Sequence, residues 1–442
     1  MNAVHSAYWL AYRAALTDAT AVRATSNYLR YGQDCNADRA AAETYAALCA
    51  SIRGRDANGT LPDVMLPLTE AKTFGALESA WRQVPILTRE GLNRTARPPR
   101  KRGDVALRTG GSTGEPVSLV LSRDGFRRKR SRLISARQAI GWQPGMPTFA
   151  VWGSERDIGK PDRLKTRLHQ RASNLRMNGG FNANEGRWIA LAKEIRRQPK
   201  QVALYGYSSL LHDFASTLLR RDCVLPPGLV GTIWNGAEGI STLQREALMS
   251  ATGADVHDFY GAREIGAIAV EIEPQGGQGL TSVGPDVIVE IVDSRGHPVS
   301  SGETGRVVVS SLGISGTPLY RYEIGDLAVA GAEYAFGHLA ITELIGRSNE
   351  GVPLPGGGVV RGLFFNHAVK DFPWVRQFQC LVNVDGHRAD LRVLLNHEPS
   401  TLEKNALVQV LGRGLAGYDV TITPVRELAR TREGKLCQVI LQ

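Results

Sequence analysis

Short apolar segments alternate with amphipathic ones from residue 104 to residue 345, and this order limits the possible folds more than any other feature of the chain. Thr148–Trp152 and Gln201–Tyr205 have the composition of buried strands, and Ser209–Arg220 has the spacing of an amphipathic helix. The other segments of this pattern are Ser118–Leu121, Phe126–Ile140 and Gly231–Trp234. Strands and helices that alternate along a chain pack as a mainly parallel sheet with helices against it. The sequence therefore predicts an α/β fold for this region.

The pattern becomes richer in strands between residues 287 and 330. Val287–Val292 and Gly305–Ser310 are β-branched runs, and the polar turn between them contains Gly296-His-Pro298. We therefore expect a β-rich subdomain of hairpins inside the α/β region.

A further break falls at Gly346-Arg347, after which Pro353–Gly358 has the composition of a loop. A helix is expected at Leu402–Leu411. The strands expected around it are Phe378–Val382, Ala389–Leu395 and Val420–Thr423. This mixture predicts a small α+β domain at the C-terminal end.

The length of 442 residues exceeds what one ordinary core accommodates, so two or three domains are expected. The first part should be mainly helical, because Ala40–Ile52 has helical spacing and Thr88 can cap a short helix. We expect residues 1–100 to form the helical start of a large domain, residues 101–346 its core, and residues 347–442 the small mobile domain.

Positive charge is concentrated in one predicted helix of this basic chain, whose formal net charge is +10. The densest run is Arg127–Arg130, followed by Arg132 and Arg137. One hypothesis is a binding face for nucleic acid or for an acidic partner such as a phosphopantetheine carrier. The other is a solvated helix face, which is favoured because aromatic residues are not interleaved with the run.

Cysteine usage and hydropathy indicate a protein of the reducing cytoplasm. Five cysteines are scattered singly without CxxC spacing, so neither a zinc cluster nor disulfides are expected. No apolar stretch approaches the ~20 residues that span a bilayer. The N-terminal segment is interrupted by Arg13, so we interpret it as an amphipathic helix and not as a signal peptide.

A glycine- and hydroxyl-rich loop occupies Thr109–Pro116, with the sequence Thr-Gly-Gly-Ser-Thr-Gly-Glu-Pro. Its glycines let the backbone approach a ligand closely, and Ser112 and Thr113 add hydroxyl donors. Such a cluster of donors suits a phosphate. No Gly-Lys-Ser/Thr follows, so this is not the P-loop of nucleotide hydrolases.

Four further segments follow this loop in a recognisable order. They are Trp234–Gly239, Asp258–Glu264, Tyr320–Asp326 and Arg426–Lys435. With the loop, they resemble the adenylate-forming enzymes, a superfamily of acyl- and aryl-CoA ligases, adenylation domains and luciferases. The phenylacetate–CoA ligase family, with its relatives from capsule and polysaccharide gene clusters, is the closer match. The segments that resemble this branch are Thr109–Pro116, Tyr205–Ser209, Tyr260–Gly266 and Arg376–Gln379.

The resemblance, which covers residues 80–442, implies an ATP- and Mg²⁺-dependent enzyme with a large and a small domain. It implies catalytic roles for Lys435, Glu264 and Thr113. The residues that it assigns to ATP or AMP are Thr109, Gly110, Gly111, Ser112, Thr113, Gly114, Gly236, Ala237, Glu238, Asp258, Tyr260, Gly261, Asp326 and Arg347.

The chemistry of four of these side chains agrees with the implied roles. The ring of Tyr260 can lie against adenine. Glu264 offers a hard oxygen ligand for Mg²⁺ bridging phosphates. The Asp326 carboxylate matches the two ribose hydroxyls, as acidic residues do in dinucleotide sites. Lys435 would neutralise charge that develops at the α-phosphate during adenylation.

The acyl group is expected near a mixed aromatic and polar wall, by resemblance in position. The residues of this wall are Tyr207, Trp234, Asn235, Phe259 and Ile265. Such a wall suits an aryl or small polar acid better than a long fatty acid. CoA is the expected acceptor, with a carrier protein, an amine or another nucleophile as the alternative. A non-catalytic nucleotide-binding member is the alternative from another class, and a homodimer stays open.

One position departs from the family pattern. Arg347 begins the interdomain hinge, where the family usually has an acidic residue two positions later, but this chain has Asn349 followed by Glu350. Some relatives carry a zinc-binding cysteine cluster after the Tyr-Gly motif, whereas Glu271-Ile-Glu273 stands there and no zinc is expected. The hinge, and with it the thioester half-reaction, is the part of the resemblance with least support.

Overall fold

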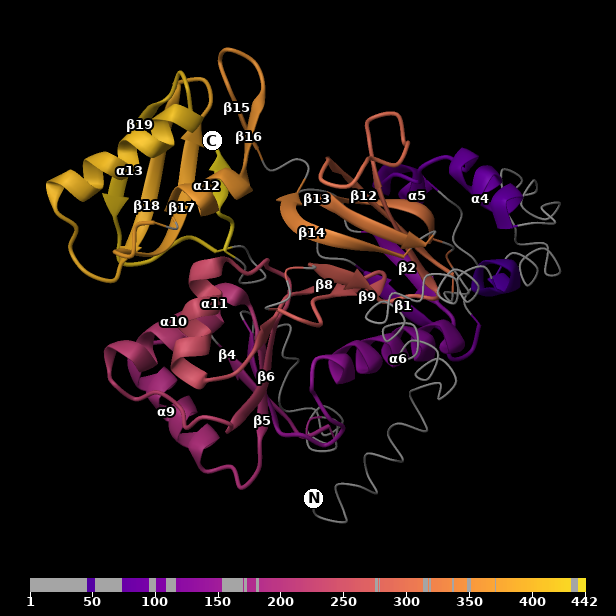
Figure 1. The fold of residues 1–442 in the computed structure, drawn as a ribbon, viewed down its shortest axis with the longest axis horizontal. Coiled ribbons are helices and arrows are strands. Elements are labelled where there is room, and N and C mark those ends of the chain that lie inside the picture. Colours follow the sequence, from indigo (N-terminus) through magenta and orange to yellow (C-terminus); the bar gives the residue numbers. More distant parts are fainter. Residues whose placement is uncertain are drawn as a thin grey trace.

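Three multi-stranded sheets organise the chain (Figure 1). The structure is a computed structural model that describes residues 46–51, 74–94, 101–108, 117–152, 170, 173–179, 183–274, 277, 279–312, 317, 319–335, 338–347, 351–369, 371–430 and 436–442. The glycine-rich loop at 109–116, Asn349 of the expected hinge and Lys435 lie outside these residues.

The first sheet is parallel, in the order β4-β3-β5-β6-β7. Its strands are β3 (Thr148–Trp152), β4 (Leu175–Gly179), β5 (Val202–Gly206), β6 (Val230–Asn235) and β7 (Val256–His257). The helices α9 (Glu185–Arg196), α10 (Ser208–Arg220) and α11 (Thr242–Thr252) cover one face (Figure 1). Alternate side chains point to opposite faces of a strand. Leu204 therefore packs with these helices, whereas Ala203 packs with α6 (Arg123–Ala139) on the other side.

The second sheet has seven strands in the order β11-β12-β13-β14-β10-β9-β8 and is antiparallel throughout. The strands are β8 (Phe259–Ala262), β9 (Gly266–Val270), β10 (Leu280–Ser282), β11 (Val287–Val292), β12 (Thr304–Ser311), β13 (Leu319–Ala335) and β14 (His338–Arg347). A hairpin of β1 (Val105–Arg108) and β2 (Ser118–Leu121) contributes Leu119 and Leu121 to the same core. Because β8 follows β7 almost directly, the chain passes from the parallel sheet into this one at Asp258.

The third sheet belongs to the small C-terminal domain, in the order β19-β18-β17-β20. Its strands are β17 (Val375–Asn383), β18 (Arg388–Leu395), β19 (Asp419–Pro424) and β20 (Val439–Leu441). The helices α12 (Gly362–Val369) and α13 (Thr401–Gly414) share its core. A short hairpin of β15 (Gly351–Pro353) and β16 (Val359–Arg361) precedes α12.

The predicted α/β class is confirmed, and most expected elements occur within a few residues of their expected bounds. The expected hairpin is the antiparallel pair β11–β12. Thr88 caps α5 (Arg89–Arg94), because its Oγ1 accepts the Gly91 N–H at 3.1 Å. In the N-terminal part the described helices are residues 46–51, α4 (Phe74–Gln83) and α5.

The interpretation of the basic helix as a solvated face is wrong for part of α6. Arg132 is fully buried, and its Nη1 contacts Asp286 Oδ2 at 2.6 Å. Arg137 lies over the rings of Tyr205 and Trp234, 5.5 and 5.2 Å from their centroids. Because α6 is wedged between the parallel sheet and β9, the side chains on this face enter the protein, whereas Arg128 stays exposed.

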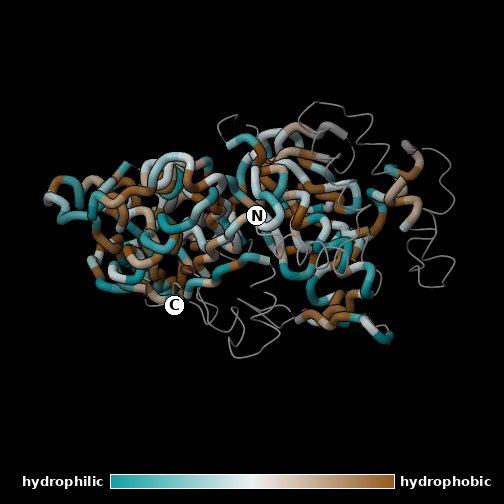
Figure 2. The backbone as a smooth tube through the Cα atoms, turned by 90° about the horizontal axis from the view of Figure 1, so that it is seen from below, coloured by the Kyte–Doolittle hydropathy of each residue, from teal (hydrophilic) through white to brown (hydrophobic). Residues whose placement is uncertain are grey.

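Seen from below, hydrophobic segments occur in both the left and the right half of the molecule (Figure 2). Separate clusters of buried side chains accompany the parallel sheet, the seven-stranded sheet and the small domain. Among the described residues, no helix combines the length and the apolar character that crossing a membrane requires.

Candidate active site

The candidate site forms at the carboxyl edge of the parallel sheet. Tyr207 directly follows β5, Trp234 and Asn235 end β6, and Asp258 directly follows β7. The carboxyl ends of parallel strands meet along one edge, which is where ligands bind in open α/β sheets. The structure therefore brings together residues that the sequence places up to 51 positions apart, from Tyr207 to Asp258.

Aromatic rings line this edge. Tyr205 stacks on Trp234 with ring centroids 5.4 Å apart. Trp152, at the end of β3, lies 5.0 Å from Tyr205 and 4.4 Å from Tyr207. Gly236 stands against this wall, because a Cβ there would lie 2.9 Å from Tyr205 Cε2. The expected acyl wall is thus extended by Trp152 and Tyr205, which the sequence reasoning did not nominate.

Asn235 organises the polar side of the edge. Its Nδ2 donates to Asp258 Oδ1 at 2.6 Å and to the Glu238 carbonyl oxygen at 2.7 Å, while its Oδ1 accepts the Phe259 N–H at 2.7 Å. Removal from water raises the pKa of Asp258 to about 6, against the lowering effect of the Asn235 hydrogen bond. Asn235 is itself completely buried, so its amide fixes the turn after β6 to the start of β8.

Tyr260, Asp326 and Arg347 form a second group within the seven-stranded sheet. The Tyr260 hydroxyl donates to Asp326 Oδ2 at 2.6 Å, and Arg347 Nε lies 3.3 Å from Asp326 Oδ1. Arg347 also donates to the Ile324 carbonyl oxygen at 2.9 Å. Burial and the Asp326 charge raise the pKa of Tyr260 well above its usual value, so its hydroxyl stays a donor.

Glu264 and Ile265 lie in the turn between β8 and β9. Both are buried, and Tyr322 Oη lies 3.5 Å from Glu264 Oε1. Arg132 stabilises this turn, because its Nη2 donates to the Ile265 carbonyl oxygen at 2.8 Å. Lys129 donates to the Arg263 carbonyl oxygen, so the turn is flanked by cationic side chains.

The carboxylate of Glu238 lies between the start of α10 and the C-terminal segment. Ala237 before it has a positive φ of 68°, and this turn directs the chain back toward α10. The Glu238 carboxylate accepts the N–H of Ser209 at 3.0 Å and the N–H of Leu436 at 3.0 Å. Its side chain therefore joins the large domain to the small one, while adenine contacts by the backbone of Gly236, Ala237 and Glu238 stay a prediction.

Seven of the assigned residues lie outside the described residues: Thr109, Gly110, Gly111, Ser112, Thr113, Gly114 and Lys435. Gly261 lies exposed in β8, directly after Tyr260. Trp152 could have been found from sequence, because it ends a predicted strand in the same way as Trp234. Lys129 and Arg137 carried no such signal within their basic run.

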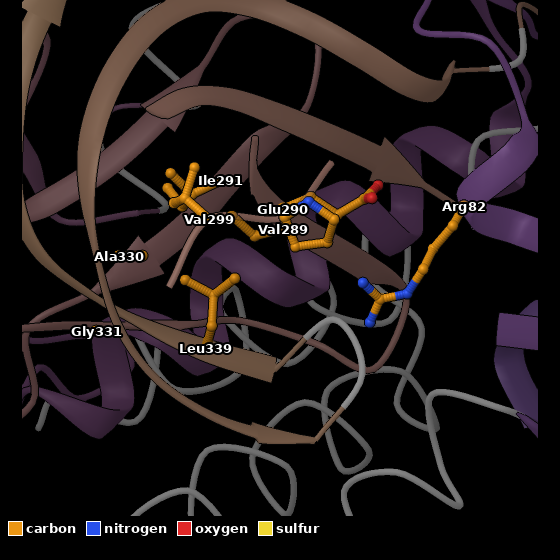
Figure 3. A pocket seen from close by; sticks show the side chains of 9 residues that line it. Arg82, Val289, Glu290, Ile291, Val299, Ala330, Gly331 and Leu339 are labelled. Atoms are coloured by element: carbon orange, nitrogen blue, oxygen red, sulfur yellow. The ribbon is translucent and has the colours of Figure 1, made fainter. Parts of the chain in front are cut away.

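Arg321, inside the segment Tyr320–Asp326, has a structural environment. It is 2% exposed, pairs with Glu290 at 3.0 Å, and donates to the carbonyl oxygens of Arg82 and Val84 at 2.8 Å. A small cavity adjoins this pair on the seven-stranded sheet; Figure 3 shows Arg82 and Glu290 at one end of it and Leu339 at the other. None of the assigned site residues lines this cavity.

Searches with protein-family models and among curated proteins gave no match for this sequence. Solved structures do match. A 2-hydroxyisobutyryl-CoA ligase in the postadenylation state, in complex with 2-HIB-AMP, aligns at a TM-score of 0.64 with 16% identity over 97% of this chain and 91% of its own. In an open conformation with 2-HIB-AMP and CoA, the same ligase aligns at 0.51, again with 16% identity, over 95% and 91%.

Two other structures match a shorter part. The anthranilate CoA ligase AuaEII, in complex with anthranoyl-AMP, aligns at 0.55 with 18% identity over 75% of this chain and 66% of its own. The amide bond synthetase McbA from Marinactinospora thermotolerans aligns at 0.53 with 18% identity over 76% and 67%. The chain has the fold of the adenylate-forming ligases. In this fold, the expected division into a large domain and a small C-terminal domain is confirmed.

Proposed function

We propose that the protein is an ATP- and Mg²⁺-dependent ligase that activates a carboxylic acid as its acyl-adenylate. A carboxylate oxygen attacks the α-phosphorus of ATP, the bond to the β-phosphate oxygen breaks, and pyrophosphate leaves. The sulfur of a thiol then attacks the acyl carbon, AMP leaves, and the thiol proton passes to solvent. The observation that carries this proposal is the hydrogen-bonded group of Tyr260, Asp326 and Arg347 in the seven-stranded sheet of an adenylate-forming ligase fold.

Each of these residues has a part in holding the nucleotide. Tyr260 offers its ring to adenine while its hydroxyl orients Asp326. Asp326 retains lone pairs for the ribose hydroxyls, and Arg347 fixes the carboxylate from the other side. We place the β- and γ-phosphates against the backbone and hydroxyls of Thr109–Gly114, including the catalytic Thr113, and assign transition-state charge neutralisation to Lys435.

Glu264 fits the requirements of a magnesium ligand in this scheme. It is a buried carboxylate, and the neutral Tyr322 hydroxyl lies 3.5 Å from its Oε1, a distance that leaves the carboxylate able to accept a cation. Mg²⁺ is usually held by one or two carboxylates together with substrate phosphates. When bound, the ion would neutralise phosphate charge, and Glu264 would hold it beside the turn that Arg132 supports.

We propose an aryl or small polar acid as the substrate. The rings of Trp152, Tyr205, Tyr207 and Trp234 supply flat apolar walls, and the missing side chain of Gly236 lets the backbone lie against Tyr205 and Trp152. Aromatic walls with few polar groups are typical of small-molecule pockets. The matching anthranilate CoA ligase holds an aryl-adenylate, and the 2-hydroxyisobutyryl-CoA ligase a small hydroxy acid.

CoA is the proposed acceptor, because the ligase that aligns over nearly the whole chain is a CoA ligase. Transfer to an amine is the second candidate, and the alignment with the amide bond synthetase favours it over a carrier protein. We further propose the phenylacetate–CoA ligase family as the relevant branch and residues 347–442 as the small domain, on the motifs quoted above.

The proposal is tested by pyrophosphate release from ATP with a panel of aryl, hydroxy and amino acids. We expect release with at least one acid and its loss, by at least about 100-fold, in Lys435→Ala. Lys193→Ala, on an exposed lysine of α9, is the matched control and should behave as the wild type. Silence across the panel, or full activity in Lys435→Ala, would overturn the assignment.

A further inference from the structure

The first turn of α10 is a meeting point of the large and small domains. Gln377 Nε2 donates to the Ser209 carbonyl oxygen at 2.7 Å, and Arg430 Nη1 donates to Ser209 Oγ at 3.2 Å. One turn further, Arg376 Nε lies 3.7 Å from Asp213 Oδ1. Three side chains of the small domain thus contact one short stretch of the large domain.

Glu238 adds a contact with the backbone of Leu436 in the small domain. Its Oε2 accepts the Ser209 N–H and its Oε1 accepts the Leu436 N–H, both at 3.0 Å. A carboxylate at the first turn of a helix is stabilised by the free N–H groups and the helix dipole. Hydrogen bonds to an ionised acceptor are also stronger than neutral ones. The carboxylate therefore connects the start of α10 directly to the backbone of the small domain.

The two flanks of residues 431–435 are held by this one surface. Arg430 and Leu436 pair as an isolated antiparallel bridge. Arg430 reaches Ser209 through its side chain, and Leu436 reaches Glu238 through its backbone N–H. The Leu436 nitrogen is covalently bonded to the carbonyl carbon of Lys435, so the Glu238 hydrogen bond acts one bond away from that lysine.

The backbone of Glu238, which carries the accepting carboxylate, is itself held by hydrogen bonds. The Glu238 carbonyl oxygen accepts from Ser208 Oγ at 3.0 Å and from Asn235 Nδ2 at 2.7 Å. Ser208 and Ser209 are both buried. A group that is held by its neighbours before docking loses less entropy when a partner arrives. The Glu238 carboxylate is thus prearranged to accept the N–H of Leu436.

We propose that Ser209 and Glu238 form a docking site that positions the Lys435 segment for adenylation, with Glu238 as the positioning residue. This inference rests on the proposed function for the role of Lys435. The domain arrangement supports it: this chain aligns better with the postadenylation state of the 2-hydroxyisobutyryl-CoA ligase than with its open conformation, at TM-scores of 0.64 and 0.51. The docking contacts thus belong to a domain arrangement that is closer to this postadenylation state than to the open conformation.

The first test is hydrogen exchange of the full-length protein, followed by mass spectrometry of peptides that begin upstream of Lys435 and contain Leu436. Glu238→Ala should speed exchange at the Leu436 amide about tenfold or more, because its acceptor is lost. Glu238→Gln keeps one oxygen acceptor and should fall between wild type and Glu238→Ala. Glu246→Ala, on an exposed carboxylate of α11, should leave exchange unchanged.

The second test is acid-dependent exchange of pyrophosphate with ATP. Glu238→Ala should lower kcat about tenfold or more, with KM for ATP within about threefold, because only the positioning of the lysine is lost. Partial recovery in Glu238→Gln and a smaller loss in Ser209→Ala are expected. A merely structural role would instead lower the melting temperature and change all constants together.

The outcomes separate the two proposals. If the wild type exchanges no pyrophosphate with any acid, the proposed function fails, while hydrogen exchange still decides whether Glu238 docks the chain end. Unchanged protection in Glu238→Ala overturns the docking site. Lost protection with an unchanged kcat overturns the positioning role.

Discussion

The hydroxyl of Tyr260 donates a 2.6 Å hydrogen bond to Oδ2 of Asp326. Tyr260 lies in the edge strand β8, and the strands β9, β10 and β14 separate it from β13 in the hydrogen-bonded order of the sheet. The sheet therefore curls until its edge approaches its middle, and two residues nominated separately for adenine and ribose act as one unit. Arg347 completes the unit from the other carboxylate oxygen.

Tyr260→Phe should weaken ATP binding while keeping the ring. Loss of the hydroxyl removes one of the groups that orient Asp326, and a hydrogen bond to a charged group contributes about 1.5–3 kcal/mol. We expect KM for ATP to rise about 10- to 150-fold, which is this free energy converted at 1.4 kcal/mol per factor of ten. Tyr418→Phe removes a comparable hydroxyl, which donates to Pro353 in the small domain, and should leave KM unchanged. Equal effects of the two variants would contradict a special role for the Tyr260–Asp326 pair.

Arg132→Met should destabilise the large domain strongly. Arg132 is completely buried and holds both Asp286 and the Ile265 carbonyl oxygen, so its loss leaves a carboxylate unpaired. Breaking such a buried pair typically costs about 3–5 kcal/mol, whereas replacing both partners by apolar groups can be neutral. Denaturant unfolding should show this loss and its recovery in Arg132→Met with Asp286→Leu. Arg94→Met, in an exposed pair with Glu90, should cost less than about 1 kcal/mol.

Lys129 should make the free energy of unfolding depend on pH in the alkaline range. Burial, together with the positive charges of Arg132 and Arg263, lowers the pKa of Lys129 to about 8. The unfolded chain keeps this proton up to about pH 10.5, so it binds more protons than the folded chain between these values. The free energy of unfolding should therefore rise with pH across this window, relative to Lys129→Met, by up to about 2 kcal/mol once partial exposure is allowed for.

The measurement is the difference in unfolding free energy between wild type and Lys129→Met at several pH values. Other titrating groups cancel in this difference. The exposed Lys193, changed to Met, should give a difference that stays flat over the same range. A flat curve for Lys129 would mean that its charge is well solvated in the folded protein.

Trp152→Ala should change which acids are accepted. Its ring closes the aromatic wall beside Tyr205 and Tyr207, so its removal makes room for a larger aryl group. We expect the ratio of kcat/KM for a bulky over a small aryl acid to rise about tenfold. Gly236→Ala should act in the opposite direction, because its methyl group would lie 2.9 Å from Tyr205. Phe372→Ala, on a half-buried ring of the small domain, should leave the ratio unchanged.

Local patterns were sufficient for much of the fold. The strand Thr148–Trp152 was expected with the bounds that the structure shows, and Thr88 was expected as a cap. These features depend on residues within a few positions of one another, because alternation and capping are local properties. The motifs likewise nominated Tyr260, Asp326 and Asn235, which the structure brings to one region.

Tertiary structure alone decided how distant residues meet. The basic run at 127–137 reads as a solvated face, yet Arg132 turns inward because Asp286, 154 positions away, offers it a buried partner. The motif around Glu238 predicts backbone contacts with adenine, and only the fold shows that its carboxylate binds the Leu436 N–H 198 positions away. The sequence by itself determined the order and type of the elements, since short-range periodicity encodes them. The pairing of Arg132 with Asp286 and the contact of Glu238 with Leu436 depend on how whole sheets pack. Local sequence patterns contain no information about that packing.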